Sequence, residues 1–534
     1  MSGVRDKLQI DEETKARQQR ATDPAHSAWV TANAGSGKTY VLSRRVLRLL
    51  LTGADPGAVL CLTFTKAAAA QMQTRVFEEL ATWTQARDND LATALNDLLG
   101  RSPDRRETQL ARRLFARAIE TPGRLKIQTI HAFCESVLQR FPFEARVPAG
   151  FTVLDDDMAQ VLKVQARQDV LAEPGSDELA AALGRLNLQL DPDRFARLLA
   201  SLTDRRNDFD IWLEGSRISQ GRVRAHVAGV LGVSPGITSQ EVVRDILSSP
   251  HLPIKEWTAI ANALSQYPQA STDVTARLLR QAASETDAGE TVARLTEVFW
   301  SDSKNKQRDR LLNAEAANAL PAIAQRLEDE QARFLPLMQT YRAARIMELN
   351  GDLALAGDAV ITRYERAKAE RGMLDYADLI ARTVGLLEFG HDAAWVLYKL
   401  DPGLDHILVD EAQDTSPDQW RVVRALTEEF FAGAGARHVS RTVFAVGDPK
   451  QLIYSFQGAD PAGFLAMAEH FEARIPEDSG FETVELFRSF RTAPAVLEAV
   501  DHVFANAGAR RGVVFDTERP VAHSAARGKA MGRG

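Results

Sequence analysis

The sequence has little cysteine, no long apolar run and no excess of positive charge, and each absence excludes a class of protein. Cys61 and Cys134 are the only cysteines in 534 residues, which excludes a disulfide framework and favours a reducing cytoplasm. Apolar runs of about eighteen uncharged residues are absent, and residues 1–20 have no signal-peptide core, so we expect no membrane segment. Because the net charge is −7, any nucleic-acid site must be a local groove.

The composition that is present is that of a large globular protein. Hydrophobic residues make up 45% and charged residues 26% of the chain, and 534 residues suggest about three domains. Strand and helix signals alternate in residues 1–150, give way to helical periodicity in 151–373, and alternate again from 374. The pattern predicts an α/β parallel sheet, built from 1–150 and 374–480 and interrupted by an all-helical insertion at 151–373.

A candidate phosphate-binding loop lies near the amino terminus, between an apolar run at 28–30 and the start of a helix at 40. It fits the P-loop pattern except at its first position, where Ala32 replaces glycine. Lys38 would reach the β- and γ-phosphates of ATP, and the Thr39 hydroxyl would bind Mg²⁺. The candidate nucleotide-binding residues are Ala32, Asn33, Ala34, Gly35, Ser36, Gly37, Lys38 and Thr39. The alternative is a glycine-rich turn without a ligand.

Two acids follow a later apolar strand, at the position where a P-loop enzyme needs carboxylates. Residues 407–409 are apolar, and Asp410 and Glu411 come directly after them. Asp410 would hold Mg²⁺, and Glu411 would orient or deprotonate the attacking water. Without a P-loop upstream, the same pair would be two exposed acids at a strand end.

Seven segments together resemble the motifs of the UvrD/Rep-type superfamily-one DNA helicases, in that family's order. They are Gln18, the loop 32–39, and residues 63–68, 129–133, 410–414, 447–459 and 489–492. Within the family, the loop, the run around 62–67 and residues 374–379 look most like AddA proteins. Those are the helicase–nuclease subunits of bacterial complexes that repair double-strand breaks. RecB-like and plain UvrD-like relatives remain open.

The resemblance implies a RecA-like fold and a motor that uses ATP and Mg²⁺ to move 3′→5′ along single-stranded DNA and unwind duplex ends. It also implies a heterodimer with an AddB-like partner. In the family's pattern, Gln18 would read the adenine and Phe490 would pack on it. The residues expected to sense or stabilise the γ-phosphate are Gln413, Gln451 and Arg491.

The same resemblance predicts a single-strand path beside the ATP site. Phe64, Tyr454 and Phe456 would stack on unpaired bases, each stack contributing about 1–3 kcal/mol. Lys66 and His131 would contact phosphates. Taken singly, each aromatic is more often a core residue, and a histidine is more often a satisfied polar group.

The chain differs from the family pattern after Arg491. Family members continue into a second RecA-like domain, and AddA proteins also carry a nuclease domain. We expect residues 481–534 to be the truncated start of the second RecA-like domain with a disordered tail, and we expect slow ATP hydrolysis. Two alternatives stay open: a non-motor ATP-dependent binding or clamp protein, and an RNA helicase or other P-loop enzyme.

Overall fold

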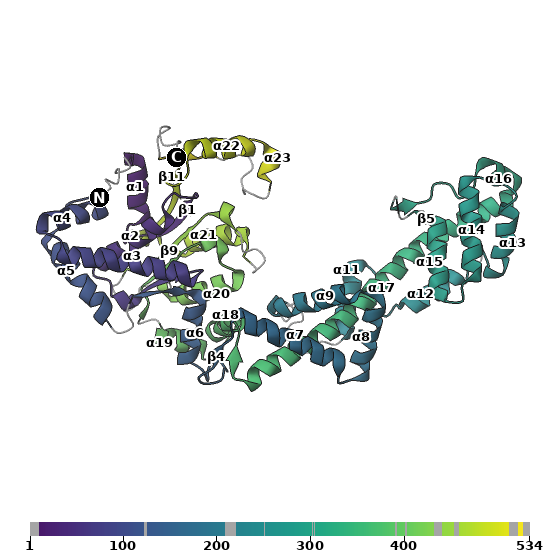
Figure 1. The fold of residues 1–534 in the computed structure, drawn as a ribbon, viewed down its shortest axis with the longest axis horizontal. Helices are drawn as coiled ribbons and strands as arrows, with labels where there is room; N and C mark the ends of the chain where they lie inside the picture. The colour runs from purple at the N-terminus through teal and green to yellow at the C-terminus, as the bar shows by residue number, and fades with distance from the viewer. Residues whose placement is uncertain are drawn as a thin grey trace, which may run out of the picture. The chain divides into compact units, whose positions relative to one another are not determined.

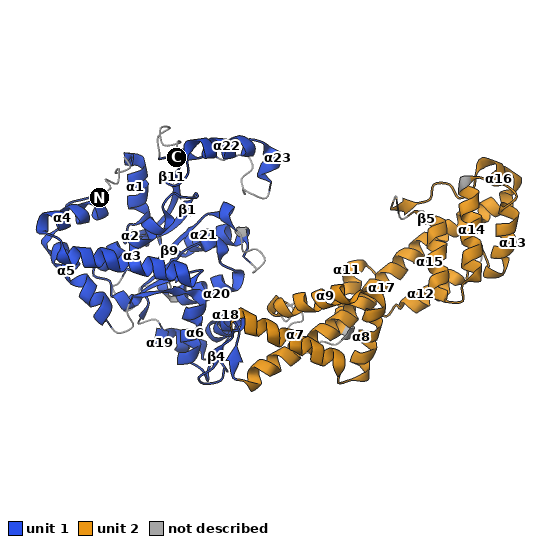
Figure 2. Cartoon of the chain, in the orientation of Figure 1, with its two compact units in different colours: residues 1–154, 372–534 blue, residues 155–371 orange. Residues whose placement is uncertain are grey.

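The computed structural model describes residues 10–121, 125–208, 220–249, 251–301, 303, 305–389, 392–400, 403–431, 440–452, 459–511 and 522–526. The chain divides into two compact units (Figure 2). One is built from residues 1–154 and 372–534, and the other is residues 155–371. The sequence predicted an insertion at 151–373, whereas the second unit begins at Asp155 and ends at Arg371. The predicted fold class, an α/β parallel sheet with a large helical insertion, is confirmed.

A six-stranded sheet forms the centre of the first unit, with the strand order β10-β1-β9-β8-β2-β3. All neighbouring strands are parallel. The strands are β1 (Ser27–Ala32), β2 (Val59–Thr63), β3 (Lys126–Thr129), β8 (His406–Val409), β9 (Thr442–Gly447) and β10 (Phe481–Leu486). The strands β1, β9, β8 and β2 each lie between two others, which explains their nearly continuous apolar sequences.

Two apolar cores cover the two faces of this sheet. Alternate side chains of β2 point to opposite faces, so Leu60 joins one core and Cys61 the other. The Cys61 core is covered by α1 (Glu12–Ala21), α2 (Lys38–Leu51), α3 (Lys66–Gln85), α4 (Asp88–Leu99) and α5 (Arg105–Glu120). In Figure 1, α3 and α5 pack side by side. The other core contains Cys134 and lies under α6 (Ile130–Arg140), α18 (Tyr376–Val384), α19 (Ala393–Leu400), α20 (Pro417–Thr427) and α21 (Pro461–Arg474).

Local capping explains where the helices near the strand ends begin. The Thr65 hydroxyl accepts the Ala68 N–H at the start of α3, and the Thr129 hydroxyl accepts the Ala132 N–H at the start of α6. The predicted cap at Asp375 is confirmed, because its side chain accepts the Asp378 N–H in a reciprocal capping box. The caps at Thr65 and Thr129 fix the turns that follow β2 and β3.

The second unit is helical and is organised along α17 (Pro321–Glu370), a helix of 50 residues (Figure 1). The shorter helices are α7 (Asp156–Ala172), α8 (Asp177–Gln189), α9 (Pro192–Asp204), α11 (Gln220–Leu231), α12 (Ser239–Leu247), α13 (Ile254–Leu264), α14 (Ala270–Ser284), α15 (Ala288–Phe299) and α16 (Ala314–Ala319). One buried cluster joins the first half of α17 to α12–α15, and another joins its second half to α7–α9. A small hairpin, β5 (Trp300–Ser301) with β6 (Lys306–Gln307), follows α15.

A short parallel pair marks where the first unit is interrupted. β4 (Thr152–Val153) pairs with β7 (Met373–Leu374), and the Leu154 N–H donates to the Leu374 carbonyl at 2.8 Å. The two ends of the interruption therefore lie next to each other in the first unit.

The segment from 481 onward differs from what we expected. We predicted that it would open a second RecA-like domain, but β10 is a strand of the first sheet and pairs with β1. After it come β11 (Arg488–Ser489), α22 (Pro494–Phe504), α23 (Ala507–Arg510) and β12 (Ser524–Ala525). Across the described ranges, no helix combines the length and apolarity needed to span a membrane.

Candidate nucleotide site

The loop between β1 and α2 has the backbone geometry of an anion cradle. Gly35 and Gly37 have φ of +73° and +95°, in the left-handed region that glycine adopts without strain. Gly37 occupies the N-cap of α2, so no side chain caps the first-turn N–H groups. Free N–H groups and the helix dipole make such an end favourable for phosphate.

Residues that follow β10 pack directly against this loop. The Phe490 N–H donates to the Gly35 carbonyl at 2.8 Å. A Cβ placed on Gly35 would lie 2.7 Å from Cβ of Arg491 and 2.9 Å from Oγ of Ser489. Phe490, predicted to pack on the adenine, and Arg491, predicted to stabilise the γ-phosphate, thus lie next to the predicted phosphate loop.

Glu411 meets Lys38 at the carboxyl end of the sheet. The Asp410 N–H donates to the Leu62 carbonyl at 2.9 Å, which extends the β8–β2 pairing one residue past the end of β8. Glu411 then adopts a left-handed φ of +48°, and its carboxylate forms an ion pair with the Lys38 ammonium. The chain separation of the two residues is 373 positions, so the fold itself creates this contact.

Asp410, the residue before Glu411, has an unusual pKa. Its side chain is buried, with 6% exposure. Burial, and secondarily the Glu411 charge, raise its pKa to about 7, and the Lys38 ammonium lowers it in part. A buried carboxyl group whose pKa lies near 7 and which interacts with a lysine is typical of a functional site. A divalent cation would favour the ionised form of this carboxyl group.

Gln413 connects this ion pair to the turn after β9. Its Nε2 donates to Glu411 Oε2 at 2.9 Å, and its Oε1 accepts the Asp448 N–H at 2.9 Å. Gln451 donates from Nε2 to Asp448 Oδ2 at 2.6 Å. The two predicted γ-phosphate sensors are therefore both bonded to Asp448, and Gln413 also contacts Glu411.

Comparison with known proteins identifies the family of this arrangement. A family model described as the UvrD/REP helicase N-terminal domain matches residues 13–472. The chain belongs to this family. The predicted resemblance is confirmed, and the match covers both the phosphate loop and the Asp410–Glu411 pair.

Similar curated proteins are named as the A-type subunits of ATP-dependent helicase/nucleases. The one from Lactobacillus acidophilus is 25% identical over 92% of this chain and 40% of its own length. Those from Levilactobacillus brevis and Pelotomaculum thermopropionicum are 27% and 26% identical, over 90% and 89% of this chain and 37% of their own lengths. The chain thus spans about two fifths of the length of these relatives.

Two residues at the candidate site had no role in the sequence prediction. One is Asp448, which is 1% exposed and accepts a hydrogen bond from the Gln451 side chain. The other is Lys450, whose Nζ donates to Asn33 Oδ1 at 2.6 Å. Asn33 itself was predicted only as a member of the loop. The available signal was the acid at the end of β9, since an acid at that end of a parallel strand faces the same edge as Asp410.

The residues of the site fit a magnesium-bound triphosphate. Ser36 Oγ is buried and has no hydrogen-bond partner among the described residues. Lys38 supplies a cation, Asp410 and Glu411 supply carboxylates, and Thr39 lies in the first turn of α2. Backbone N–H groups, one lysine, one hydroxyl and one carboxylate are the set that holds Mg²⁺ and phosphate in P-loop enzymes.

Gln18 lies on α1, which packs beside β10. Its side chain is buried, with 7% exposure. The neighbouring Arg17 places its guanidinium 4.7 Å from the centre of the Phe487 ring and donates to the Glu485 carbonyl at 3.1 Å. Gln18 therefore lies on the helix that contacts β10, the strand that leads to Phe490. Its predicted recognition of adenine stays a prediction.

The predicted DNA-contacting residues within the described chain lie at the same edge of the sheet. Phe64 follows β2, Lys66 begins α3, and His131 lies in the first turn of α6. The His131 ring meets the Tyr376 ring edge-on at 5.1 Å. Tyr454 and Phe456 lie outside the described residues, and their predicted stacking role remains untested.

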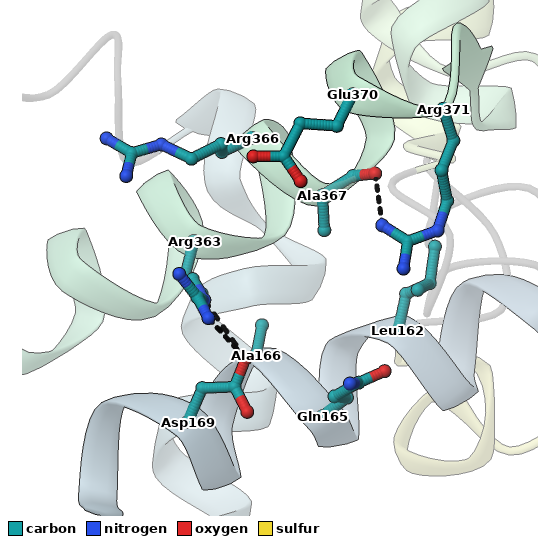
Figure 3. A pocket seen from close by; sticks show the side chains of 9 residues that line it. All are labelled: Leu162, Gln165, Ala166, Asp169, Arg363, Arg366, Ala367, Glu370 and Arg371. Carbon is teal, nitrogen blue, oxygen red and sulfur yellow. Dashed lines mark hydrogen bonds and ion pairs between the residues drawn. The ribbon is translucent and has the colours of Figure 1, made fainter. Parts of the chain in front are cut away.

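A cavity of about 120 Å³ in the second unit contains none of the predicted site residues. It lies between α7 and α17, and Figure 3 shows the side chains around it. Arg363 is paired with Asp169 at 2.9 Å, and Arg371 donates to the Ala367 carbonyl at 2.8 Å. We assign no role to this cavity.

Proposed function

We propose that this chain is the ATP-binding part of a DNA motor. The activity is that of an ATP-dependent helicase of double-strand-break repair, moving 3′→5′ along single-stranded DNA and unwinding duplex ends. The observation that carries the proposal is the ion pair between Lys38 and Glu411, which unites the phosphate loop with the carboxylate-tipped strand. Membership of the UvrD/REP family supports it.

The chemistry follows from the positions of these side chains. Bound Mg²⁺ would neutralise charge on the β- and γ-phosphates, with Thr39 and Asp410 as its protein ligands. A γ-phosphate would replace the Glu411 carboxylate at the Lys38 ammonium. Glu411 would then be free to orient the attacking water and accept its proton.

Charge that develops on the γ-phosphate needs a further cation. Arg491 is exposed and adjoins Gly35, and its guanidinium would reach this charge as an arginine finger. Gln413 would report the state of Glu411 to Asp448, because it bonds both groups. Phe64, Lys66, His131, Tyr454 and Phe456 would hold the single strand.

A partner protein belongs to this proposal. The names of the similar curated proteins describe each of them as one subunit of a helicase/nuclease. We propose an AddB-like protein chain as the partner, and single-stranded DNA and duplex ends as the nucleic-acid partners.

Nucleotide binding and single-turnover hydrolysis, measured with and without single-stranded DNA, test the proposal. Lys38→Ala should abolish Mg·ATP binding, because the loop loses its cation. Glu411→Gln should still bind Mg·ATP but hydrolyse it at least about 100-fold more slowly, as expected for loss of a general base. Lys399→Met, which changes an exposed lysine of α19, is the matched control.

Two outcomes would contradict the proposal: wild-type hydrolysis by Glu411→Gln, or ATP binding that survives Lys38→Ala. Fluorescence anisotropy with single-stranded and duplex oligonucleotides separates a motor from a clamp. The motor predicts a preference for the single strand that changes with the bound nucleotide, whereas a clamp predicts tight duplex binding.

A further inference from the structure

The phosphate loop is bonded to strands on both of its sides. It follows β1, which lies between β10 and β9 in the sheet. On the β10 side, the Asn33 N–H donates to the Leu486 carbonyl at 2.9 Å, and Asn33 Nδ2 donates to the Phe487 carbonyl at 3.4 Å. On the β9 side, Asn33 Oδ1 accepts from Lys450 Nζ at 2.6 Å. The Asn33 side chain therefore ties the loop to the segments that follow both neighbouring strands.

Lys450 is itself fixed by the turn in which it lies. This turn, Pro449–Gln451, is capped by Asp448, whose Oδ1 accepts the Lys450 N–H at 3.1 Å. The ammonium also lies 3.6 Å from the same oxygen. Asp448 is buried and Lys450 is about one-quarter exposed, so the ammonium is held between one carboxylate and one amide oxygen.

The contact with Asn33 is strong for its type. It is short, its donor is charged, and Asn33 is only 7% exposed, so water competes poorly for either group. A loop that binds phosphate through its backbone depends on those N–H groups being aligned before the anion arrives. Holding Asn33 from the β9 side limits how far the first half of the loop can move.

We propose that Lys450 is a positioning residue for ATP binding, which acts by holding Asn33 and does not itself contact the nucleotide. The inference rests on the proposed function, because it assumes that residues 32–39 bind ATP. Removal of this contact loosens the loop and weakens nucleotide binding, while the hydrolytic groups Glu411 and Arg491 stay in place. Lys450 should therefore affect affinity and leave the rate at saturation nearly unchanged.

A double-mutant cycle on the full chain tests this inference. Lys450→Met and Asn33→Ala should each raise the dissociation constant of a fluorescent ATP analogue with Mg²⁺ by about tenfold. Both variants remove the Lys450–Asn33 contact, and Asn33→Ala also removes the longer bond from Asn33 Nδ2 to the Phe487 carbonyl. The double variant should therefore be weakened no more than Asn33→Ala alone, and not by the roughly hundredfold of independent effects. Single-turnover hydrolysis by Lys450→Met at saturating ATP should stay within about twofold of the wild type.

Two further variants separate the possible causes. Lys450→Arg keeps a charged donor and should restore binding to within about threefold of the wild type. Asn33→Ala leaves the partners of Asp448 intact, so an equal effect of this variant excludes a general disturbance of the turn. Lys399→Met is the control for loss of one surface charge.

Additive effects in the cycle would overturn the inference and indicate that Lys450 contacts the nucleotide directly. Wild-type affinity in Lys450→Met, with ATP binding abolished in Lys38→Ala, would overturn the inference but leave the proposed function standing. If Lys38→Ala also bound ATP normally, the proposed function itself would fail.

Discussion

Glu411 shows at the scale of a single residue how the site differs from its surroundings. Its left-handed φ of +48° is one that non-glycine residues rarely adopt, with a cost of about 1–3 kcal/mol. The conformation turns its carboxylate toward Lys38 and away from the direction of β8. Strain of this kind persists where surrounding contacts fix it, and here the ion pair and Gln413 do so.

The crowding at Gly35 gives a first prediction. Gly35→Ala should weaken Mg·ATP binding by at least about tenfold, because the new methyl group would push Arg491 and Ser489 away from the loop. Gly53→Ala is a matched control: its φ of +97° is also left-handed, but a Cβ there meets nothing within 4 Å. Both variants should lose about 1–2 kcal/mol of stability from backbone strain.

Titration calorimetry of Mg·ATP, with thermal unfolding of both variants, checks this expectation. Equal losses of ATP affinity in the two variants would show that backbone strain alone, and not the contact with Arg491, explains the effect.

Asp410 gives a second prediction, on stability. Its folded-state pKa, about 7, exceeds the ordinary value of 3.8, so the folded state holds a proton that the unfolded state releases between these values. The stability this contributes is fully present below pH 3.8 and is lost as pH rises through 7. Asp410→Asn removes the cost of the buried charge, so it should be more stable than the wild type at pH 8 and should not bind Mg·ATP productively.

Denaturant unfolding of both proteins from pH 5 to 8 measures this difference. The advantage of Asp410→Asn should grow with pH by at most about 1.4 kcal/mol per unit. An advantage that does not vary with pH would show that Asp410 is ionised in the folded protein throughout this range.

Sequence reasoning found the residues that belong to contiguous motifs and predicted that two of these motifs would meet. The phosphate loop and the acids after 409 follow from local spacing, and the structure places Lys38 and Glu411 in contact. Asp448 and Lys450 were missed as site residues because their partners, Gln413 and Asn33, are distant in sequence. A single sequence does not show which strands are neighbours, and that order decides these contacts.

At the scale of elements, buried polar contacts join α2, β8 and β9 near the amino ends of the two strands. Arg45 of α2 is fully buried and donates to Thr442 Oγ1 of β9 at 3.2 Å. The same oxygen lies 2.9 Å from Nδ1 of His406 at the start of β8. Burial, and then the charge of Arg45, lower the pKa of His406 to about 3.

This histidine gives a third prediction. The unfolded chain takes up a proton at His406 below pH 6.5, whereas the folded chain does so only near pH 3, so acid favours unfolding between these values. The free energy of unfolding of the wild type should fall in this window by up to about 1.4 kcal/mol per unit more than that of His406→Gln. Parallel pH profiles for the two proteins would rule out a neutral, buried His406.

The prediction that residues from 481 open a second domain was wrong for β10, which belongs to the first sheet. Its apolar pattern is correct for a strand, but the pattern does not state which sheet the strand joins. In the structure it completes the sheet next to β1, and its end brings Phe490 to the loop. Only the crossover connections decide such an order, and they depend on packing between distant helices.

At the scale of the whole molecule, each buried apolar cluster of the described chain draws its residues from one unit. The composition change in the sequence was enough to predict an all-helical insertion, because a period of three to four residues differs from strand alternation. It was not enough to predict α17, whose 50 residues include Pro336. In a sequence, a proline predicts the end of a helix or a kink, because it lacks the backbone N–H and clashes with the preceding turn. Packing against neighbouring helices, which the sequence does not show, can keep the helix continuous.

Separate cores give a fourth prediction. Replacement of residues 155–371 by a flexible linker of about four to six residues should leave a folded first unit, because Leu154 and Gly372 adjoin the paired strands β4 and β7. This protein should bind Mg·ATP with an affinity close to that of the full chain. Residues 155–371 alone should fold as a helical protein.

Circular dichroism and ATP titration of the two pieces check this expectation. An excised first unit that is unfolded, or that binds ATP only when mixed with the helical piece, would contradict it.

The two cysteines have a practical consequence. Cys61 lies in one core of the sheet and Cys134 in the other, and burial raises the pKa of both thiols, that of Cys134 to about 12. Alkylation requires an accessible thiolate, so a reagent in solution reaches each sulfur only when its own core opens. The chain thus carries two built-in reporters of local unfolding, and peptide mapping after timed labelling would tell which face of the sheet gives way first.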